Sequence, residues 1–240
     1  MNLLPEPIAL FYSIAGFDPS LIERCETGEK YAGIMLRNGN IGVCAILGQH
    51  VDNMILTTGR PDLSDPGHRI ILNAWFNALY NYDMPVVGQG DIFERERFSA
   101  YRKIVMIGSF VSLTDKFRKY DIPLHIFDMM SDEDFLVPMN LQPEFLSDAD
   151  CVILTGTTIS NNSFMEVISH TPSTCDIFLL GPSNVLHRTM FRYRNIKVVF
   201  GSRFKKYDHK VLDLIRDGHG TRSFLEPVNK VYISEPMNPA

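Results

Sequence analysis

Two segments decide the fold of this chain: Cys151-Val-Ile-Leu-Thr155-Gly-Thr-Thr158 and Ile177-Phe-Leu-Leu180-Gly-Pro-Ser183. Their apolar runs are typical of strands buried on both faces, as in a parallel sheet. A helical pattern joins them. The small and hydroxylated residues that follow each run therefore fall at the carboxyl ends of neighbouring strands. In open α/β sheets, ligands bind at this edge.

The rest of the second half of the chain continues the alternation of strands and helices. Further strands are predicted at Ile104–Ile107, Leu124–Phe127 and Val198–Phe200, and a last one at Val228–Ser234. Helices are predicted at Leu113–Tyr120, Pro143–Ala149, Asn161–Ser169 and Asp208–Asp217. Such alternation predicts βαβ units and a mostly parallel sheet.

Each predicted parallel strand ends in polar or turn-forming residues. These are Gly108-Ser109, Asp128, Thr155-Gly156-Thr157, Gly181-Pro182-Ser183 and Gly201-Ser202. Glycine lets a ligand approach the backbone closely, and hydroxyls with free amides can hold its oxygens. The sequence thus predicts a site for a small polar ligand at this edge.

The same strand ends limit the choice of cofactor. Asp128 occupies the position that holds a ribose hydroxyl in dinucleotide-binding folds, but it could also simply begin the next loop. The segment Gly108–Leu113 lacks the second and third fingerprint glycines, and the chain has no GxxxxGK[ST] loop. A P-loop site is therefore excluded and ordinary NAD or FAD binding is disfavoured. A methyltransferase-like site stays open, so the cofactor is unknown.

Asn161-Asn162-Ser163 precede the helix that follows the first motif. One of them is expected to be its N-cap. Two asparagines next to Thr157 and Thr158 exceed what capping requires, and a helix amino end also offers free amides to an anion. Asn161 is therefore counted as a ligand-binding candidate.

The first part of the chain has a different pattern. Asn38-Gly39 lies between the apolar runs Gly33–Leu36 and Ile41–Ile46, which predicts an antiparallel hairpin with a type I′ turn. A helix is predicted at His68–Tyr82. It carries Asn73, Asn77 and Asn81 four residues apart, so they form one stripe. That stripe could face solvent, another element or a ligand. We place the domain boundary near residue 95, giving domains 1–95 and 96–240.

Bulk composition excludes several classes of protein. The net charge of −5 with no dense basic stripe makes nucleic acid a poor partner. No apolar run reaches membrane-spanning length and no leader pattern opens the chain, which predicts a cytoplasmic protein. The four cysteines and seven histidines show no metal-ligand spacing. Cys44 is expected to be structural, and His187 could overhang the ligand edge.

These residues together resemble a known family, the heavy-metal chelation domain family. The resemblance rests on the Thr155–Ser163 motif, on Gly181-Pro182-Ser183, on the Gly33–Leu47 hairpin and on the helix with Asn73-Ala74-Trp75-Phe76-Asn77. It implies a small enolase N-terminal-like α+β domain followed by a Rossmann-like three-layer α/β domain, with a site in the cleft between them. Carried over by position, Thr155, Gly156, Thr157, Asn161, Gly181, Pro182 and Ser183 would line that cleft. The family's small residue and proline after Gly-Pro-Ser are replaced here by Asn184-Val185.

Two functions follow as hypotheses. One is an enzyme acting by condensation or hydrolysis on a small heterocyclic metabolite; the resemblance suggests the synthesis or processing of a pterin-, flavin- or siderophore-like chelator. In it, Gly108, Ser109 and Asp128 complete the site, and Asn73 and Asn77 approach from the first domain. The alternative is a non-catalytic binding protein for a metal or a metal–chelate complex. No base or nucleophile stands out. A structural role and a homodimer also stay open.

Overall fold

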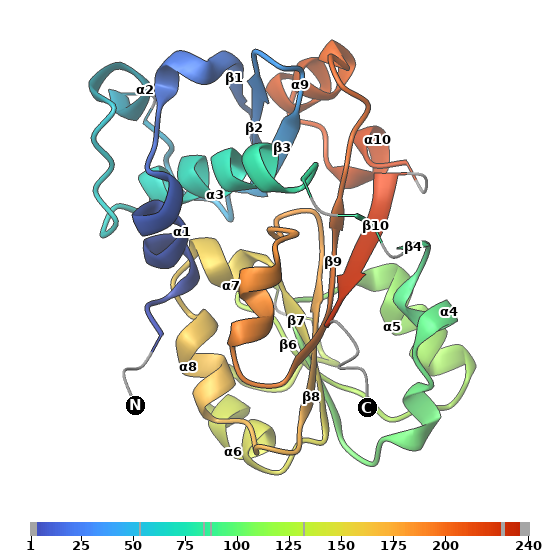
Figure 1. The fold of residues 1–240 in the computed structure, drawn as a ribbon. Helices are drawn as coiled ribbons and strands as arrows, with labels where there is room; N and C mark the ends of the chain where they lie inside the picture. The colour runs from blue at the N-terminus through green and yellow to red at the C-terminus, as the bar shows by residue number, and fades with distance from the viewer. Residues whose placement is uncertain are drawn as a thin grey trace.

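The structure is a computed structural model, which describes residues 4–52, 54–83, 85–86, 88–131, 133–226 and 229–235. The protein has a mixed α/β fold. A seven-stranded, mostly parallel sheet flanked by helices lies beside a separate three-stranded antiparallel sheet (Figure 1). The predicted α/β class with two sheet units is thereby confirmed.

The large sheet is built from five parallel strands and two antiparallel ones. The parallel strands are β5 (Ile104–Ile107), β6 (His125–Phe127), β7 (Cys151–Thr155), β8 (Asp176–Leu180) and β9 (Ile196–Ser202), and β10 (Lys230–Ser234) and β4 (Gly88–Gln89) are antiparallel. Their order is β4-β10-β9-β8-β7-β5-β6. Because β7 pairs with both β5 and β8, the strand ends predicted to meet do lie side by side.

Helices cover both faces of this sheet. They are α4 (Ile92–Arg95) and α5 (Val111–Lys119) on one face, and α6 (Gln142–Ser147), α7 (Thr157–Ser160) and α8 (Phe164–Ser169) on the other. Val105 and Val152 belong to the core under α6 and α8, whereas the next residues, Met106 and Ile153, pack in the core under α4 and α5. Since both faces are covered, each strand needs apolar residues at every position.

The small sheet also lies between two helices. It consists of β1 (Ile22–Thr27), β2 (Tyr31–Leu36) and β3 (Ile41–Ala45), with α3 (Pro66–Tyr80) on one face and α9 (His209–Arg216) on the other. Gly42 permits the close approach of α3, because a Cβ there would lie 2.1 Å from the Ala74 carbonyl oxygen. On the other face Val43 packs with Leu212 and Ile215 of α9.

The predicted hairpin is confirmed, but its turn type is wrong. Gly39 has a positive φ of 84°, whereas Asn38 is not among the residues with positive φ. The Gly39 amide donates to the Leu36 carbonyl oxygen, and the Leu36 amide donates to the Asn40 carbonyl oxygen. The loop is therefore longer than a two-residue type I′ turn, and only Gly39 needs the left-handed region.

The helix predicted at Asn161–Ser169 begins at Phe164 in the structure, and a separate short helix precedes the predicted range. α7 begins at Thr157, and a turn with Asn162 at φ 65° separates it from α8. The expected side-chain cap is not formed, because Ser163 at the N-cap makes no capping hydrogen bond. Asn161 instead closes the turn, since its Oδ1 accepts from both the amide and the hydroxyl of Ser163.

The remaining elements are short and lie around the two sheets. They are α1 (Pro7–Ala15), α2 (Met54–Thr58), α10 (Thr221–Phe224) and the 3₁₀ turns η1 (Pro19–Leu21), η2 (Phe98–Ala100), η3 (Met139–Leu141) and η4 (Arg188–Arg192). Within the described ranges, no helix combines the length and apolar character needed to cross a membrane.

The chain passes more than once between the two sheet units. α9 follows β9 of the large sheet but packs on β1 and β2 of the small one. β4, at residues 88–89, precedes the predicted boundary at residue 95 but pairs with β10 of the large sheet. A boundary at that residue stays a prediction, and the contacts tie the last quarter of the chain to both units.

Candidate functional site

The carboxyl ends of the parallel strands open into a cavity of about 890 Å³, which we call the strand-end cavity. Eight of the twelve predicted ligand-binding residues line it: Gly108, Ser109, Asp128, Thr155, Thr157, Asn161, Gly181 and Pro182. The first part of the chain contributes Tyr31, Ala45 and Leu47, and the α10–β10 segment contributes Thr221, Arg222 and Lys230. Both sheet units therefore form its walls.

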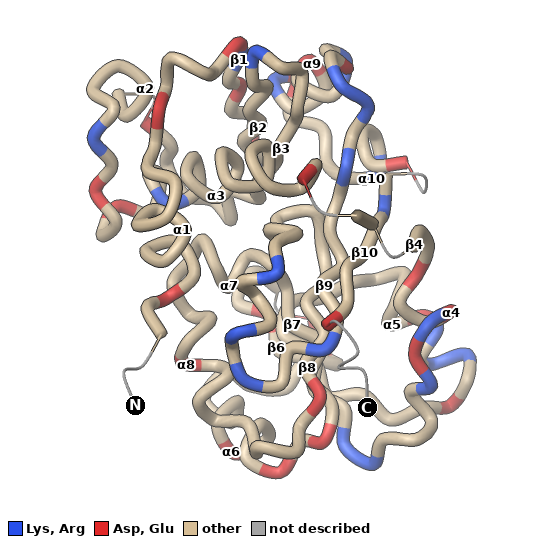
Figure 2. Tube along the Cα trace, viewed as in Figure 1, with Lys and Arg blue, Asp and Glu red and all other residues tan. Residues whose placement is uncertain are grey.

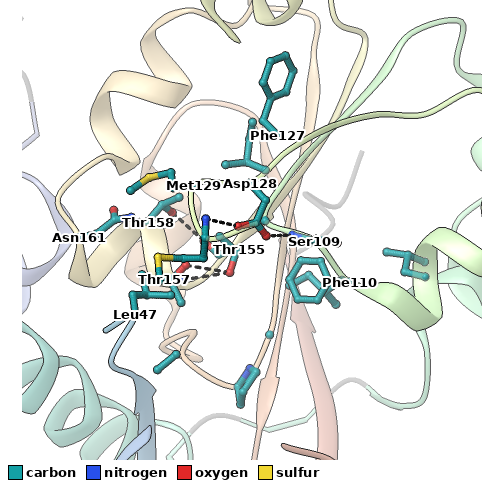
Figure 3. Close-up of a pocket in the computed structure, with 18 of the residues that line it drawn as sticks. Leu47, Ser109, Phe110, Phe127, Asp128, Met129, Thr155, Thr157, Thr158 and Asn161 are labelled. Atoms are coloured by element: carbon teal, nitrogen blue, oxygen red, sulfur yellow. Dashed lines mark hydrogen bonds between the residues drawn. The ribbon is translucent and has the colours of Figure 1, made fainter. Parts of the chain in front are cut away.

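The floor of the strand-end cavity carries hydroxyl groups that contact one another. The Thr155 and Thr157 hydroxyl oxygens lie 3.1 Å apart, and the Thr158 hydroxyl donates to the Thr155 carbonyl oxygen at 2.8 Å. Figure 3 shows Thr157 near Leu47, with Phe110 on the opposite side of the cavity. Each of these two hydroxyls can donate a hydrogen bond to a ligand oxygen or accept one from a ligand hydroxyl or amine.

Asp128 is held by the backbone on both carboxylate oxygens. Oδ2 accepts from the Ser109 amide at 2.6 Å, and Oδ1 accepts from the Met130 amide at 2.7 Å (Figure 3). These bonds join the loop after β5 to the loop after β6 and match the reading in which Asp128 begins its loop. Asp128 still lines the cavity, so contact with a ligand stays a prediction.

The strand-end glycines shape the cavity through the backbone. Gly108 and Gly181 have positive φ values of 90° and 116°, which side chains other than glycine rarely adopt. Gly156 has an ordinary φ of −61° and lies outside the cavity lining. A Cβ at Gly156 would lie 2.6 Å from Asn184 Oδ1 and 2.8 Å from the Asn184 amide nitrogen. Gly156 thus lets the loops after β7 and β8 touch.

Ser183 lies behind the cavity wall. It is outside the cavity lining, and its hydroxyl oxygen accepts from the amide of Ala45 at 3.1 Å. Its carbonyl oxygen accepts from the side-chain amides of Asn73 at 2.8 Å and Asn77 at 3.2 Å. Ser183 therefore joins the loop after β8 to the first part of the chain, and a direct ligand contact stays a prediction.

The asparagine stripe of α3 is buried, so its reading as a solvent-facing stripe is wrong. Asn73 is fully buried and Asn77 and Asn81 are each 1% exposed. Asn81 Nδ2 donates to the Ser202 carbonyl oxygen at 3.0 Å, and its Oδ1 accepts from the Leu186 amide at 2.7 Å. The stripe faces the loop after β8 and the end of β9. Neither Asn73 nor Asn77 lines the strand-end cavity.

Arg69 holds the two sheet units together from the other end of α3. Its guanidinium donates to both carboxylate oxygens of Glu6 at 3.0 Å, and to the carbonyl oxygens of Ile159 and Ser160 at 2.8 and 2.9 Å. Those two carbonyls end α7, where a cation is favourable. The sequence did not predict a role for Arg69, because no local pattern distinguishes a buried arginine of a helix from an exposed one.

Neither Cys44 nor His187 lines the strand-end cavity. Cys44 is fully buried beside Asn73, whose Nδ2 is 3.2 Å from its sulfur, and burial raises the pKa of its thiol. His187 packs against Tyr80 and Phe11, and burial lowers its pKa. It does not line the strand-end cavity, contrary to the expectation that it could overhang this edge. Among the described residues, no group of three or more His, Cys, Asp and Glu side chains could hold a metal ion.

Several residues of the cavity lie outside the predicted set. Tyr31 is one, and burial raises the pKa of its phenol to about 12, so its hydroxyl stays protonated at neutral pH. Met129 and Met130 are others, and they are 62% and 58% exposed in the loop after β6. Met130 lies next to Gly48 of the first part of the chain. These residues come from segments without a motif, so only the tertiary structure identifies them.

Comparisons with known proteins agree with this architecture. A family model, DUF364, described as “Putative heavy-metal chelation”, matches residues 91–234. A DUF364 protein of unknown function from Pyrococcus horikoshii superposes with a TM-score of 0.76 at 16% identity, over 89% of this chain and 93% of that one. Another from Desulfitobacterium hafniense has a TM-score of 0.75 at 16% identity, over 95% and 98%. No curated protein matches the sequence.

Proposed function

Because this chain belongs to the DUF364 family, described as “Putative heavy-metal chelation”, we propose that it binds a small organic chelator or its metal complex in the strand-end cavity. The ligand would be a polar, oxygen-rich molecule of the pterin, flavin or siderophore type. It would enter between the first part of the chain and the carboxyl ends of the parallel strands. The single observation that carries the proposal is the chemistry of the cavity lining.

The lining is suited to recognising an organic molecule. Thr155 and Thr157 provide hydroxyls, and Asn161 provides an Nδ2 group that has no partner among the described residues. Gly108 and Gly181 open the backbone to close approach. Such groups form hydrogen bonds but are poor ligands for a soft metal, which prefers thiolate and imidazole. In our proposal the chelator supplies the metal's own ligands.

The walls of the cavity suit a flat or partly apolar ligand. Phe110, Leu47, Met129 and Met130 all line the cavity. Methionine side chains are flexible and adapt to ligands of different shape. A cavity of about 890 Å³ also lies within the usual range for small-molecule sites. We therefore assign recognition to this site and no bond-making step.

A thermal-shift and calorimetry screen tests the proposal. Free Ni²⁺, Co²⁺, Cu²⁺ and Zn²⁺ are compared with a pterin, a flavin and a catecholate chelator, each with and without metal. We expect the melting temperature to rise with a chelator or its complex, since a ligand that binds the folded state stabilises it. We expect Thr157→Val to weaken binding by roughly fivefold to tenfold, the effect of one lost hydrogen bond.

The matched control is Thr58→Val, because Thr58 is exposed on α2 and does not line the cavity. Equal weakening by both threonine variants would contradict the assignment of the site. Stabilisation by free metal alone, without a chelator, would replace the proposal with direct metal binding. A screen in which no compound binds would reject it.

A further inference from the structure

We propose, on the basis of the function proposed above, that the strand-end cavity selects anionic ligands. Arg222 of α10 and Lys230 at the start of β10 would hold the carboxylate or phosphate group of the ligand. Arg222 and Lys230 would be specificity-determining residues that lie outside every strand-end motif. The ligand would then be an acidic molecule and not merely a polar one.

The two cations line the cavity and are not engaged elsewhere. Arg222 and Lys230 are both exposed, and neither side chain makes an ion pair or hydrogen bond with the residues that the structure describes. Other basic residues of the chain, such as Arg69 and Lys116, do form ion pairs. Figure 2 shows basic residues on α10 and at the start of β10. A ligand anion would give them a partner.

Two of the three acids that line the cavity are engaged by other groups of the protein. Asp91 lies 3.0 Å from the Lys116 ammonium and accepts from the Phe93 amide at 2.8 Å. Asp128 accepts from two backbone amides. Glu166 lines the cavity too, but it belongs to α8, which lies far from α10 in Figure 1. The cavity therefore has a positive end formed by α10 and β10.

The start of α5 adds a further positive group to the cavity. Residues 109–113 line the cavity, and Phe110 at the N-cap offers no side-chain acceptor. The amides of Val111 and Ser112 have no partner in the described part of the chain, so the helix presents its positive pole there. The Lys230 carbonyl oxygen accepts from the amide of Gly90, which also lines the cavity.

The other walls are apolar, which defines the shape of the expected ligand. Phe110, Met129 and Met130 add apolar surface to the cavity. Charges in a partly enclosed cavity with apolar walls are less screened than charges on an open surface. The geometry thus favours an aromatic or aliphatic body that carries an acidic group.

Two fluorescent probes separate the charge from the apolar body. 8-Anilinonaphthalene-1-sulfonate is an aromatic anion, and N-phenyl-1-naphthylamine is its neutral counterpart. Fluorescence titrations compare wild-type protein with Arg222→Gln, Lys230→Gln and the double variant. Lys210→Gln is the control, because Lys210 is exposed on α9 and does not line the cavity. A crystal structure of the complex with the anionic probe locates the binding site.

We expect the double variant to raise the Kd of the anionic probe about tenfold, equivalent to about 1.4 kcal/mol. The Kd of the neutral probe should change less than about twofold, and Lys210→Gln should leave both unchanged. Added salt should weaken the anionic probe selectively. Competition with 1-naphthoate and with 1-naphthyl phosphate then shows which anion is preferred. Melting temperatures of all variants confirm that they are folded.

The failure of this inference is distinct from the failure of the proposed function. If the anionic probe binds in the cavity but its Kd is unchanged in the double variant, the role of Arg222 and Lys230 is overturned and the cavity remains a ligand site. If neither probe binds, or the anionic probe binds elsewhere in the crystal, the proposed function loses its support as well.

Discussion

Replacing Arg69 by methionine should destabilise the protein by about 3–5 kcal/mol, the usual cost of breaking a buried ion pair by removing one partner. The Arg69 side chain is 5% exposed and bonds both oxygens of Glu6. It also bonds the carbonyl oxygens of Ile159 and Ser160 at the end of α7. Methionine fills most of the space but donates no hydrogen bond.

The magnitude follows from what each partner loses. A hydrogen bond from a charged donor contributes about 1.5–3 kcal/mol, and the Ile159 and Ser160 carbonyls lose one each. Glu6 loses less, because its side chain is 20% exposed and still accepts from the amides of Ile8 and Ala9. Packing of the methionine offsets part of the sum, which gives the range above.

Urea unfolding followed by circular dichroism measures the change. The control is Arg216→Met: Arg216 is 50% exposed and pairs with Asp213 and Asp217 at the surface, where such pairs contribute about 0–1 kcal/mol. If Arg69→Met lowered the free energy of unfolding by less than about 1 kcal/mol, as the control should, the argument that Arg69 joins the two sheet units would be refuted.

Two further substitutions test other parts of the structure. Gly156→Ala should lower the free energy of unfolding by about 1–3 kcal/mol, because the added methyl group overpacks against Asn184. The control is Gly220→Ala, whose Cβ would meet only Lys30 at 3.5 Å. In the same urea assay it should lower the free energy of unfolding by less than about 1 kcal/mol. His187 has a pKa lowered by burial, and its Nδ1 accepts from the Thr189 amide. As the pH falls through the unfolded pKa of about 6.5, the unfolded chain takes up the proton first and stability falls. His187→Asn should reduce this loss between pH 7 and 5, and an unchanged pH profile would contradict the assignment.

Much of the edge that forms the strand-end cavity could be predicted from local pattern. The apolar runs Cys151–Leu154 and Ile177–Leu180 indicated strands covered on both faces, and the polar residues after them had to lie on one edge once the strands were parallel. Of the eight predicted residues that line the strand-end cavity, all but Asn161, which follows α7, do so for that reason. The hairpin around Gly39 was also predictable, although its turn type was not.

Partners that are distant in sequence could not be predicted. Asn73 and Asn81 have the same spacing whether they face water or the Ser183 and Ser202 carbonyls, since periodicity shows which residues share a face and not what that face meets. Asp128 follows a strand whether it binds a ligand or only begins the next loop. The two amides that hold it come from separate loops, which the sequence does not bring together.

The sequence by itself determined the α/β class, the sheet edge where the strand-end cavity lies and the missing dinucleotide fingerprint, because each depends on residues that are neighbours along the chain. Only the tertiary structure decided what surrounds that edge. It placed α9 on the small sheet, buried Arg69 against α7 and brought Arg222 and Lys230 to the cavity. Burial and charge compensation depend on contacts between distant segments, so local pattern carries no record of them.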